Sequence, residues 1–422
     1  MTPEATAPNG MTPDATGGPP SSASSRRPWP RIAVTSVFAV HGLLFASWTA
    51  HIPHVKARLG LTDGTLGYAL LGAPIGSICA MLVAAYLLPR VGSRRVVQIA
   101  LVGYCAAGPL VGLTGSLVAL MGALFVWGAF QGALDVAMNT QAIAVERTAR
   151  QLLMSGLHGT WSIGSFVGAG IGAVAVGVGI SLTPQLLVLG TLALLAAGML
   201  TTRMLPDVVA RPDANSHGPR SADRKPAGPS RWSGGMVLLG AIAFACMLCE
   251  GAAADWASVY LAGPLHAAGI ESGLGYASFA LAMVAVRLSG NRLLARYRPD
   301  RLLPALAALA TVGFATGLLI GKPVAAIIGF AFLGAGVASV VPAVFSAAGR
   351  IPGLHPGTAV ATASAFGWSG FVCGPPLIGR LASISSLSTA LFVLPALTAF
   401  IVAGTSIARA LKPEPTSAPV RV

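Results

Sequence analysis

The chain is built from long apolar runs, and their pattern occurs twice. The segment DGTLGYA at residues 63–69 returns 208 residues later as ESGLGYA at residues 271–277. Smaller matches at nearly the same offset pair Trp48 with Trp256, Trp161-Ser162 with Trp368-Ser369, and Ile171-Gly172 with Ile378-Gly379. A repeat at this spacing predicts two units of the same architecture, one in each half of the chain.

The composition places these runs in a membrane. Of the 422 residues, 54% are apolar and only 9% are charged, which is more apolar side chain than a soluble protein of this length can bury. The runs do not alternate as barrel strands do, so they predict helices. We predict an all-α membrane protein with twelve transmembrane helices in two pseudo-symmetric six-helix bundles. The spans are expected at residues 31–55, 65–88, 96–114, 118–145, 152–180, 183–204, 234–260, 271–293, 302–320, 323–348, 356–380 and 386–410.

The basic residues orient these spans. With both termini on one side, that side carries 22 of the 27 Lys and Arg residues. This positive-inside bias predicts a multi-pass protein of the cytoplasmic (inner) membrane with both termini in the cytoplasm. The net charge of +14 therefore reflects topology, and we expect no nucleic-acid partner.

The polar stretches divide the chain into domains. Residues 1–30 are rich in Pro, Ser, Thr and Gly and predict a disordered cytoplasmic tail. The Pro-rich, charged stretch 206–232 predicts a cytoplasmic linker between a six-helix bundle at 31–205 and a second at 233–412. Residues 413–422 are expected to form a second cytoplasmic tail.

Four Asp, Glu, Lys or Arg residues lie in the interior of the predicted spans, at least five residues from either end, where a charge costs about 2.5–3.5 kcal/mol at the helix centre. They are Asp135, Glu250, Asp255 and Arg287. Helical spacing puts Asp135 on one face with Asn139 and with small residues. A carboxyl group there is costly when charged and tolerable when neutral, so it can carry a proton across the membrane. We predict proton coupling through Asp135, with Glu250 as the second candidate. The alternative is a neutral Asp135 that hydrogen bonds to a neighbouring helix.

A second polar face lies on the predicted span 152–180. An indole beside hydroxyl and imidazole groups can hold a sugar by stacking and hydrogen bonding. The same helix carries glycines at 164, 168 and 172, so a packing ridge against another helix is the alternative. The substrate-binding set that we predict is Asn139, His158, Trp161, Ser162, Trp48, Asp255 and Trp256.

Arg287 is the one Lys or Arg residue in the interior of a predicted span, since the others within the span bounds lie at or next to a span end. Charge balance predicts a structural ion pair with Glu250 or Asp255. Direct contact with a substrate is the alternative role.

Two further features have simple interpretations. His51 and His54 lie at the outer end of the first span, where an interfacial position is the first interpretation and gating or proton access is the alternative. Cys246 and Cys249 match C-x-x-C but lie within an apolar run, so we interpret them as packing residues and not as a redox pair.

Several short motifs resemble the major facilitator superfamily over residues 31–412, and within it the fucose-permease-like branch. They are GALDVAMN at 132–139, MSGLH at 154–158, EGAAADW at 250–256, GPPLIG at 374–379, and RVGSRR at 90–95, which fits the basic end of the superfamily's general motif. The resemblance implies that Asp135 is a proton and substrate residue. The chain departs from the pattern at Pro89, where the general motif has Asp, and around Trp48, where the permease carries an Asp on span one.

These observations predict a secondary transporter that moves a small polar solute, such as a sugar, by alternating access and with proton coupling. The alternatives are a proton-driven efflux antiporter for a drug or secondary metabolite and a non-transporting sensor or scaffold. The glycine spacing at 159, 168 and 172 resembles an antiporter motif, but Ala173 replaces its Pro. No phosphate-binding loop or catalytic set occurs, so we predict no enzyme activity, cofactor or metal. The expected partners are the solute, a proton or other coupling ion, and lipid, and the protein is expected to be a monomer.

Overall fold

The computed structural model of the protein describes residues 28–151, 153–206, 233–351, 354, 356–408 and 411. Within these residues the fold is helical throughout, without a β-strand. In the described part of the chain, eleven helices are long and apolar enough to cross a membrane. The predicted span 356–380 lies in a further helix, α15 (Pro356–Ile384), whose sequence includes several Ser and Thr residues, Arg380 and two interior prolines. The predicted linker 206–232, apart from its first residue, and most of both predicted tails lie outside the described residues.

The first half contains six membrane-spanning units. They are α1 (Trp29–Ser47) with η2 (Thr49–His51) and α2 (Ile52–Arg58), α3 (Asp63–Leu70) with α4 (Gly72–Val91), α5 (Ser93–Gly112), α6 (Leu117–Ala149), α7 (Met154–Gly177), and α8 (Leu182–Ala193) with η3 (Leu194–Gly198) and α9 (Met199–Thr201). The second half contains α10 (Gly234–Ala262), α11 (Ile270–Arg296), α12 (Pro299–Ile320), α13 (Pro323–Val337) with α14 (Val340–Ala348), α15, and α16 (Leu387–Ala390) with α17 (Val393–Ile407).

Local sequence signals set several helix ends. Thr62, Ser116, Ser233 and Ser386 each accept a hydrogen bond from the backbone N–H three residues later, as N-cap side chains do. Gly321 ends α12 with a φ of 62°, a left-handed conformation that glycine adopts at little cost. These caps satisfy backbone groups at helix ends and therefore fix where each unit begins or ends.

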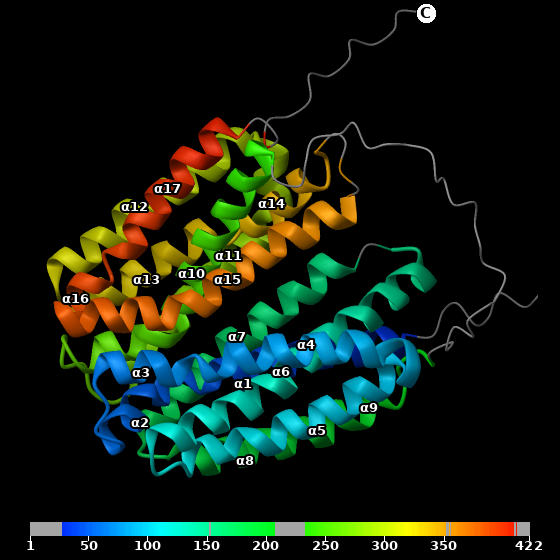
Figure 1. The fold of residues 1–422 in the computed structure, drawn as a ribbon, viewed down its shortest axis with the longest axis horizontal. Helices are drawn as coiled ribbons and strands as arrows, with labels where there is room; N and C mark the ends of the chain where they lie inside the picture. Colours follow the sequence, from blue (N-terminus) through cyan, green and yellow to red (C-terminus); the bar gives the residue numbers. More distant parts are fainter. Residues whose placement is uncertain are drawn as a thin grey trace, which may run out of the picture.

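The two halves share one internal arrangement, which agrees with the sequence repeat. In the first half α1 packs on α7, α4 and α5 pack on α6, and α5 packs on α8. The second half repeats these contacts as α10 on α15, α11 and α12 on α13, and α12 on α17. Figure 1 shows the first half, in blue to green, lying alongside the second, in green to red.

The halves meet most closely at the end away from Trp29 and Ile407, which we call the distal end. There α3 packs on α15 and α7 packs on α11. A Cβ atom on Gly67 would lie 2.5 Å from the Pro375 carbonyl oxygen, and one on Gly273 would lie 2.6 Å from Ala173 Cβ. We call these two contacts the distal interface. The repeated motifs thus lie where the halves touch, since Gly67 belongs to DGTLGYA and Gly273 to ESGLGYA. Toward the termini the ribbons of the two halves diverge (Figure 1).

Candidate functional site

A cluster of aromatic and imidazole rings joins α1, α5 and α7 in the first half. The Trp161 indole Nε1 donates a hydrogen bond to His41 Nδ1 over 2.7 Å. His41 Nε2 lies 3.4 Å from the Gln131 carbonyl oxygen, and its ring stacks on Tyr104 at 5.6 Å. Trp161 itself stacks on Phe45 at 6.2 Å. The predicted substrate residue Trp161 is therefore held by a histidine that the sequence analysis did not single out.

This cluster reaches the second half through one further ring. Phe45 meets Tyr276 of α11 edge-on at 6.3 Å between ring centroids, and Tyr276 stacks on Phe279 at 5.7 Å. Both tyrosines of the cluster are buried. The aromatic contacts therefore cross from one half to the other beside the half-buried Trp161.

The glycines of α7 form the packing ridge that was the alternative interpretation. A Cβ atom on Gly164 would overlap the Ala39 carbonyl oxygen, and one on Gly168 would overlap that of Leu43. On α1, a Cβ atom on Gly42 would overlap the Trp161 carbonyl oxygen. Side chains larger than hydrogen would force these helices apart, so the glycines place α1 and α7 in direct backbone contact.

Arg287 links the two halves near the middle of their length. Its Nη1 donates to Ser162 Oγ of α7 over 2.7 Å, and its Nε donates to the Ala338 carbonyl oxygen over 3.2 Å. Among the described residues it forms no ion pair with Glu250 or Asp255, so the predicted structural ion pair is absent in this structure. The guanidinium instead binds neutral oxygens. The Arg287 charge acts on the nearby Glu250 carboxyl group, but the two groups lie beyond ion-pair distance.

The backbone acceptor of Arg287 lies at a break in a membrane helix. The helix α13 ends at Val337 and α14 begins at Val340. Carbonyl groups freed by such a break need new donors inside a membrane. Arg287 supplies one to Ala338, and the Cys246 thiol lies 3.5 Å from the Val337 oxygen. Cys246 and Cys249 are buried free thiols, consistent with their interpretation as packing residues.

No hydrogen bond between described residues joins the three in-span carboxyl groups to one another. Asp135 accepts a bond of 3.3 Å from Asn139 Nδ2, which also donates to the Asp135 carbonyl oxygen over 2.8 Å. Glu250 and Asp255 are half-buried and accept no hydrogen bond from another described residue. The face of α6 below Asp135 packs on α4, since Ser77 Oγ donates to the Gly128 oxygen over 2.8 Å.

The other predicted substrate residues divide into two groups. His158 is exposed and meets Phe38 edge-on at 5.4 Å. Trp48 and Trp256 are only 3% and 0% exposed, and Trp48 packs edge-on against Trp127. These two tryptophans are core residues in this structure, so their predicted substrate contact would need a conformation in which they are exposed.

His51 is buried near the distal interface and does not lie at a free surface. Its Nε2 lies 2.8 Å from Gln185 Oε1, and Gln185 Nε2 donates to the Ser47 carbonyl oxygen over 2.9 Å. Nearby, Ser258 Oγ of the second half donates to the Thr49 oxygen over 2.5 Å. His51 thus fixes the junction of α1 and α8 beside a hydrogen bond that joins the halves.

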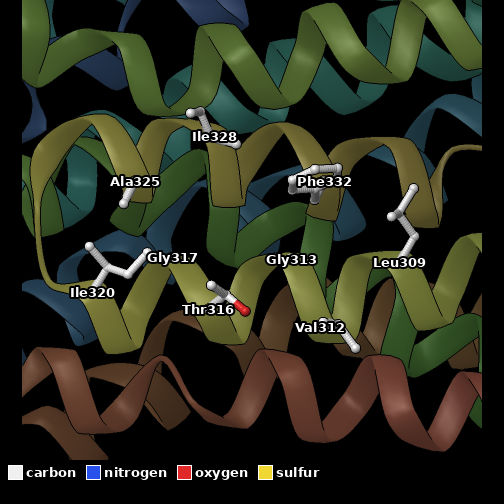
Figure 2. Close-up of a pocket in the computed structure, with 9 residues that line it drawn as sticks. All are labelled: Leu309, Val312, Gly313, Thr316, Gly317, Ile320, Ala325, Ile328 and Phe332. Carbon is white, nitrogen blue, oxygen red and sulfur yellow. The ribbon is translucent and has the colours of Figure 1, made fainter.

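An apolar groove of about 350 Å³ lies elsewhere, between α12 and α13 (Figure 2). Its lining is Leu309, Val312, Gly313, Thr316, Gly317, Ile320, Ala325, Ile328 and Phe332. Val312, Ile320 and Ile328 are more than half exposed, and no in-span charged residue belongs to the lining. A surface of this kind suits lipid contact, and we do not count it as a solute site.

Comparison with known proteins identifies the family. The family model of the Major Facilitator Superfamily matches residues 33–352. An uncharacterised MFS-type transporter of Yersinia pestis is 34% identical over 85% of this chain and 91% of its own length. The membrane protein MosC of Rhizobium meliloti is 32% identical over 87% of this chain and 88% of its own length.

The fold agrees with this match. The crystal structure of a point mutant of the nucleoside transporter NupG superposes with a TM-score of 0.69 at 11% identity, covering 89% of this chain and 98% of that one. A second crystal structure of NupG, without the mutation, gives a TM-score of 0.68 at 10% identity. Members of this superfamily are multi-pass membrane transporters and not enzymes. On the sequence match and the shared fold, this chain belongs to the Major Facilitator Superfamily.

Proposed function

We propose that the protein is a proton-coupled permease that moves a small polar, sugar-like solute across the cytoplasmic membrane by alternating access. The observation that carries the proposal is the arrangement of the halves. They touch at the distal interface and their ribbons diverge toward the termini (Figure 1), while the hydrogen bond from Arg287 to Ser162 joins polar groups of the two halves next to Trp161. A solute bound between such halves is exposed to one side at a time.

The charge distribution supports an orientation for this cycle. Because the predicted topology puts 22 of the 27 Lys and Arg residues on the side of the termini, we propose that this side faces the cytoplasm. In this proposed orientation the distal interface lies at the outer face, where we propose that the halves part to expose the solute to the outside. The solute would enter or leave beside Trp161, whose indole offers a ring for stacking.

Asp135 supports the coupling step. It is a half-buried carboxyl with one amide partner, Asn139. Its neutral form is favoured inside the membrane, so proton binding and solute binding can influence each other through this group. Glu250 is the second coupling candidate because it lies near Arg287 without an ion pair.

The test is transport by the purified protein in proteoliposomes under an imposed pH gradient. A panel of L-fucose, D-galactose, myo-inositol and uridine covers sugar rings, a cyclitol and a nucleoside, the last because NupG is a nucleoside transporter. Uptake driven by the gradient supports the proposal. Gradient-driven release of a compound supports the efflux antiporter. A transport rate that does not change with the pH gradient contradicts proton coupling.

A further inference from the structure

We propose that His41 is a positioning residue for solute recognition, because it fixes the Trp161 indole at the junction of the halves. The proposal rests on the proposed function, in which Trp161 offers its ring to the solute. His41 itself is buried, with 4% of its surface exposed, so it acts through Trp161 and does not touch the solute.

The two hydrogen bonds of His41 determine its chemical form. An indole N–H can only donate, so His41 Nδ1, at 2.7 Å from Trp161 Nε1, must carry a lone pair. A backbone carbonyl can only accept, so Nε2, at 3.4 Å from the Gln131 oxygen, carries the proton. His41 is therefore assigned as the neutral imidazole with its proton on Nε2. In this form the ring connects α7 to the backbone of α6.

The surroundings leave little freedom for either ring. His41 stacks on Tyr104 with 25° between the planes, and Trp161 stacks on Phe45 with 28° between the planes. Gly42, the next residue on α1, lets the helix approach Trp161 so closely that a Cβ atom there would overlap the Trp161 carbonyl oxygen. The indole is thus held at its edge by His41 and on its face by Phe45.

A tryptophan held in this way has only one orientation toward a ring-shaped solute. Without the acceptor on His41, the half-buried indole N–H would lose its partner and turn toward water or another oxygen. The loss of one such neutral hydrogen bond corresponds to about a five- to tenfold change in affinity. His41 is therefore a specificity-determining residue one step removed from the solute.

Two substitutions separate the acceptor from the ring. His41→Phe keeps a ring that can stack on Tyr104 but removes the acceptor. His41→Asn removes the ring but keeps an oxygen near the position of Nδ1. In protein labelled with ¹⁵N-tryptophan, the chain gives seven indole signals, and Trp161→Phe identifies that of Trp161.

We expect the Trp161 indole signal to shift upfield and to exchange faster with D₂O in His41→Phe, and to stay near its wild-type position in His41→Asn. An unchanged signal in His41→Phe would overturn the positioning role. This measurement needs no transported solute, so it remains decisive even if none of the four panel compounds is taken up, an outcome that counts against the proposed function alone.

Transport then tests recognition. For any compound of the panel that the wild-type protein carries, His41→Phe should raise KM about five- to tenfold with little change in maximal rate, and His41→Asn should restore KM to within about twofold. In a Trp161→Phe background the His41→Phe change should have no further effect on KM. Equal KM increases in both backgrounds would contradict an action through Trp161.

Discussion

Gly67 offers the sharpest test of the distal interface. A Cβ atom at this position would lie 2.5 Å from the Pro375 carbonyl oxygen and 3.2 Å from Gly379 Cα. Both neighbours are backbone atoms, so no flexible side chain can move aside. Gly67→Ala should therefore destabilise the contact between α3 and α15 by about 1–3 kcal/mol, the usual cost of overpacking.

This cost falls on one conformation and not on the fold of either half. The clash exists only while the halves touch at the distal end, because Gly67 and Pro375 belong to different halves. A penalty of about 1–3 kcal/mol shifts the ratio of distally closed to distally open molecules by about 5- to 150-fold. The variant should thus favour the distally open state.

The assay is a spin-label distance measurement across the distal end, with labels at Leu113 and Ile384, which are 68% and 67% exposed. We expect a longer distance in Gly67→Ala. Gly122→Ala is the matched control, because a Cβ atom on Gly122 meets no atom within 4 Å. Gly273→Ala, whose Cβ would lie 2.6 Å from Ala173 Cβ, should act like Gly67→Ala. An unchanged distance in both folded variants would refute the reasoning.

Three further predictions concern coupling, packing and topology. Asp135→Asn should abolish accumulation driven by a pH gradient while solute exchange persists, and full accumulation would transfer the coupling role to Glu250. Arg287→Ala should lower the free energy of unfolding by about 1–3 kcal/mol, because the Ala338 oxygen loses its donor. Adding Glu250→Gln should not restore this stability. A restored stability would instead favour an ion pair between Arg287 and Glu250. Ser216→Cys, outside the described residues, should resist membrane-impermeant thiol reagents in intact cells, and fast labelling would reverse the proposed orientation.

The sequence by itself determined the class of the protein and its twofold organisation. Unbroken apolar runs of this length predict membrane-spanning helices, because a helix satisfies its own backbone N–H and C=O groups where no water is present. The recurrence of DGTLGYA as ESGLGYA indicated two equivalent halves, and the same motifs also form the distal interface. Helical spacing correctly grouped Asp135 with Asn139, because neighbours at i and i+4 lie on one face in any helix.

Only the tertiary structure decided which residues face one another. Trp48 and Trp256 looked like substrate residues, yet both are core residues, because a sequence gives the face of a helix but not the helix opposite it. Arg287 donates hydrogen bonds to Ser162 and to the Ala338 carbonyl oxygen at the break between α13 and α14. His41 accepts a hydrogen bond from a tryptophan 120 residues away in the sequence. Such contacts depend on how closely glycine-bearing helices approach, and that distance is fixed by packing between helices and not by the local sequence.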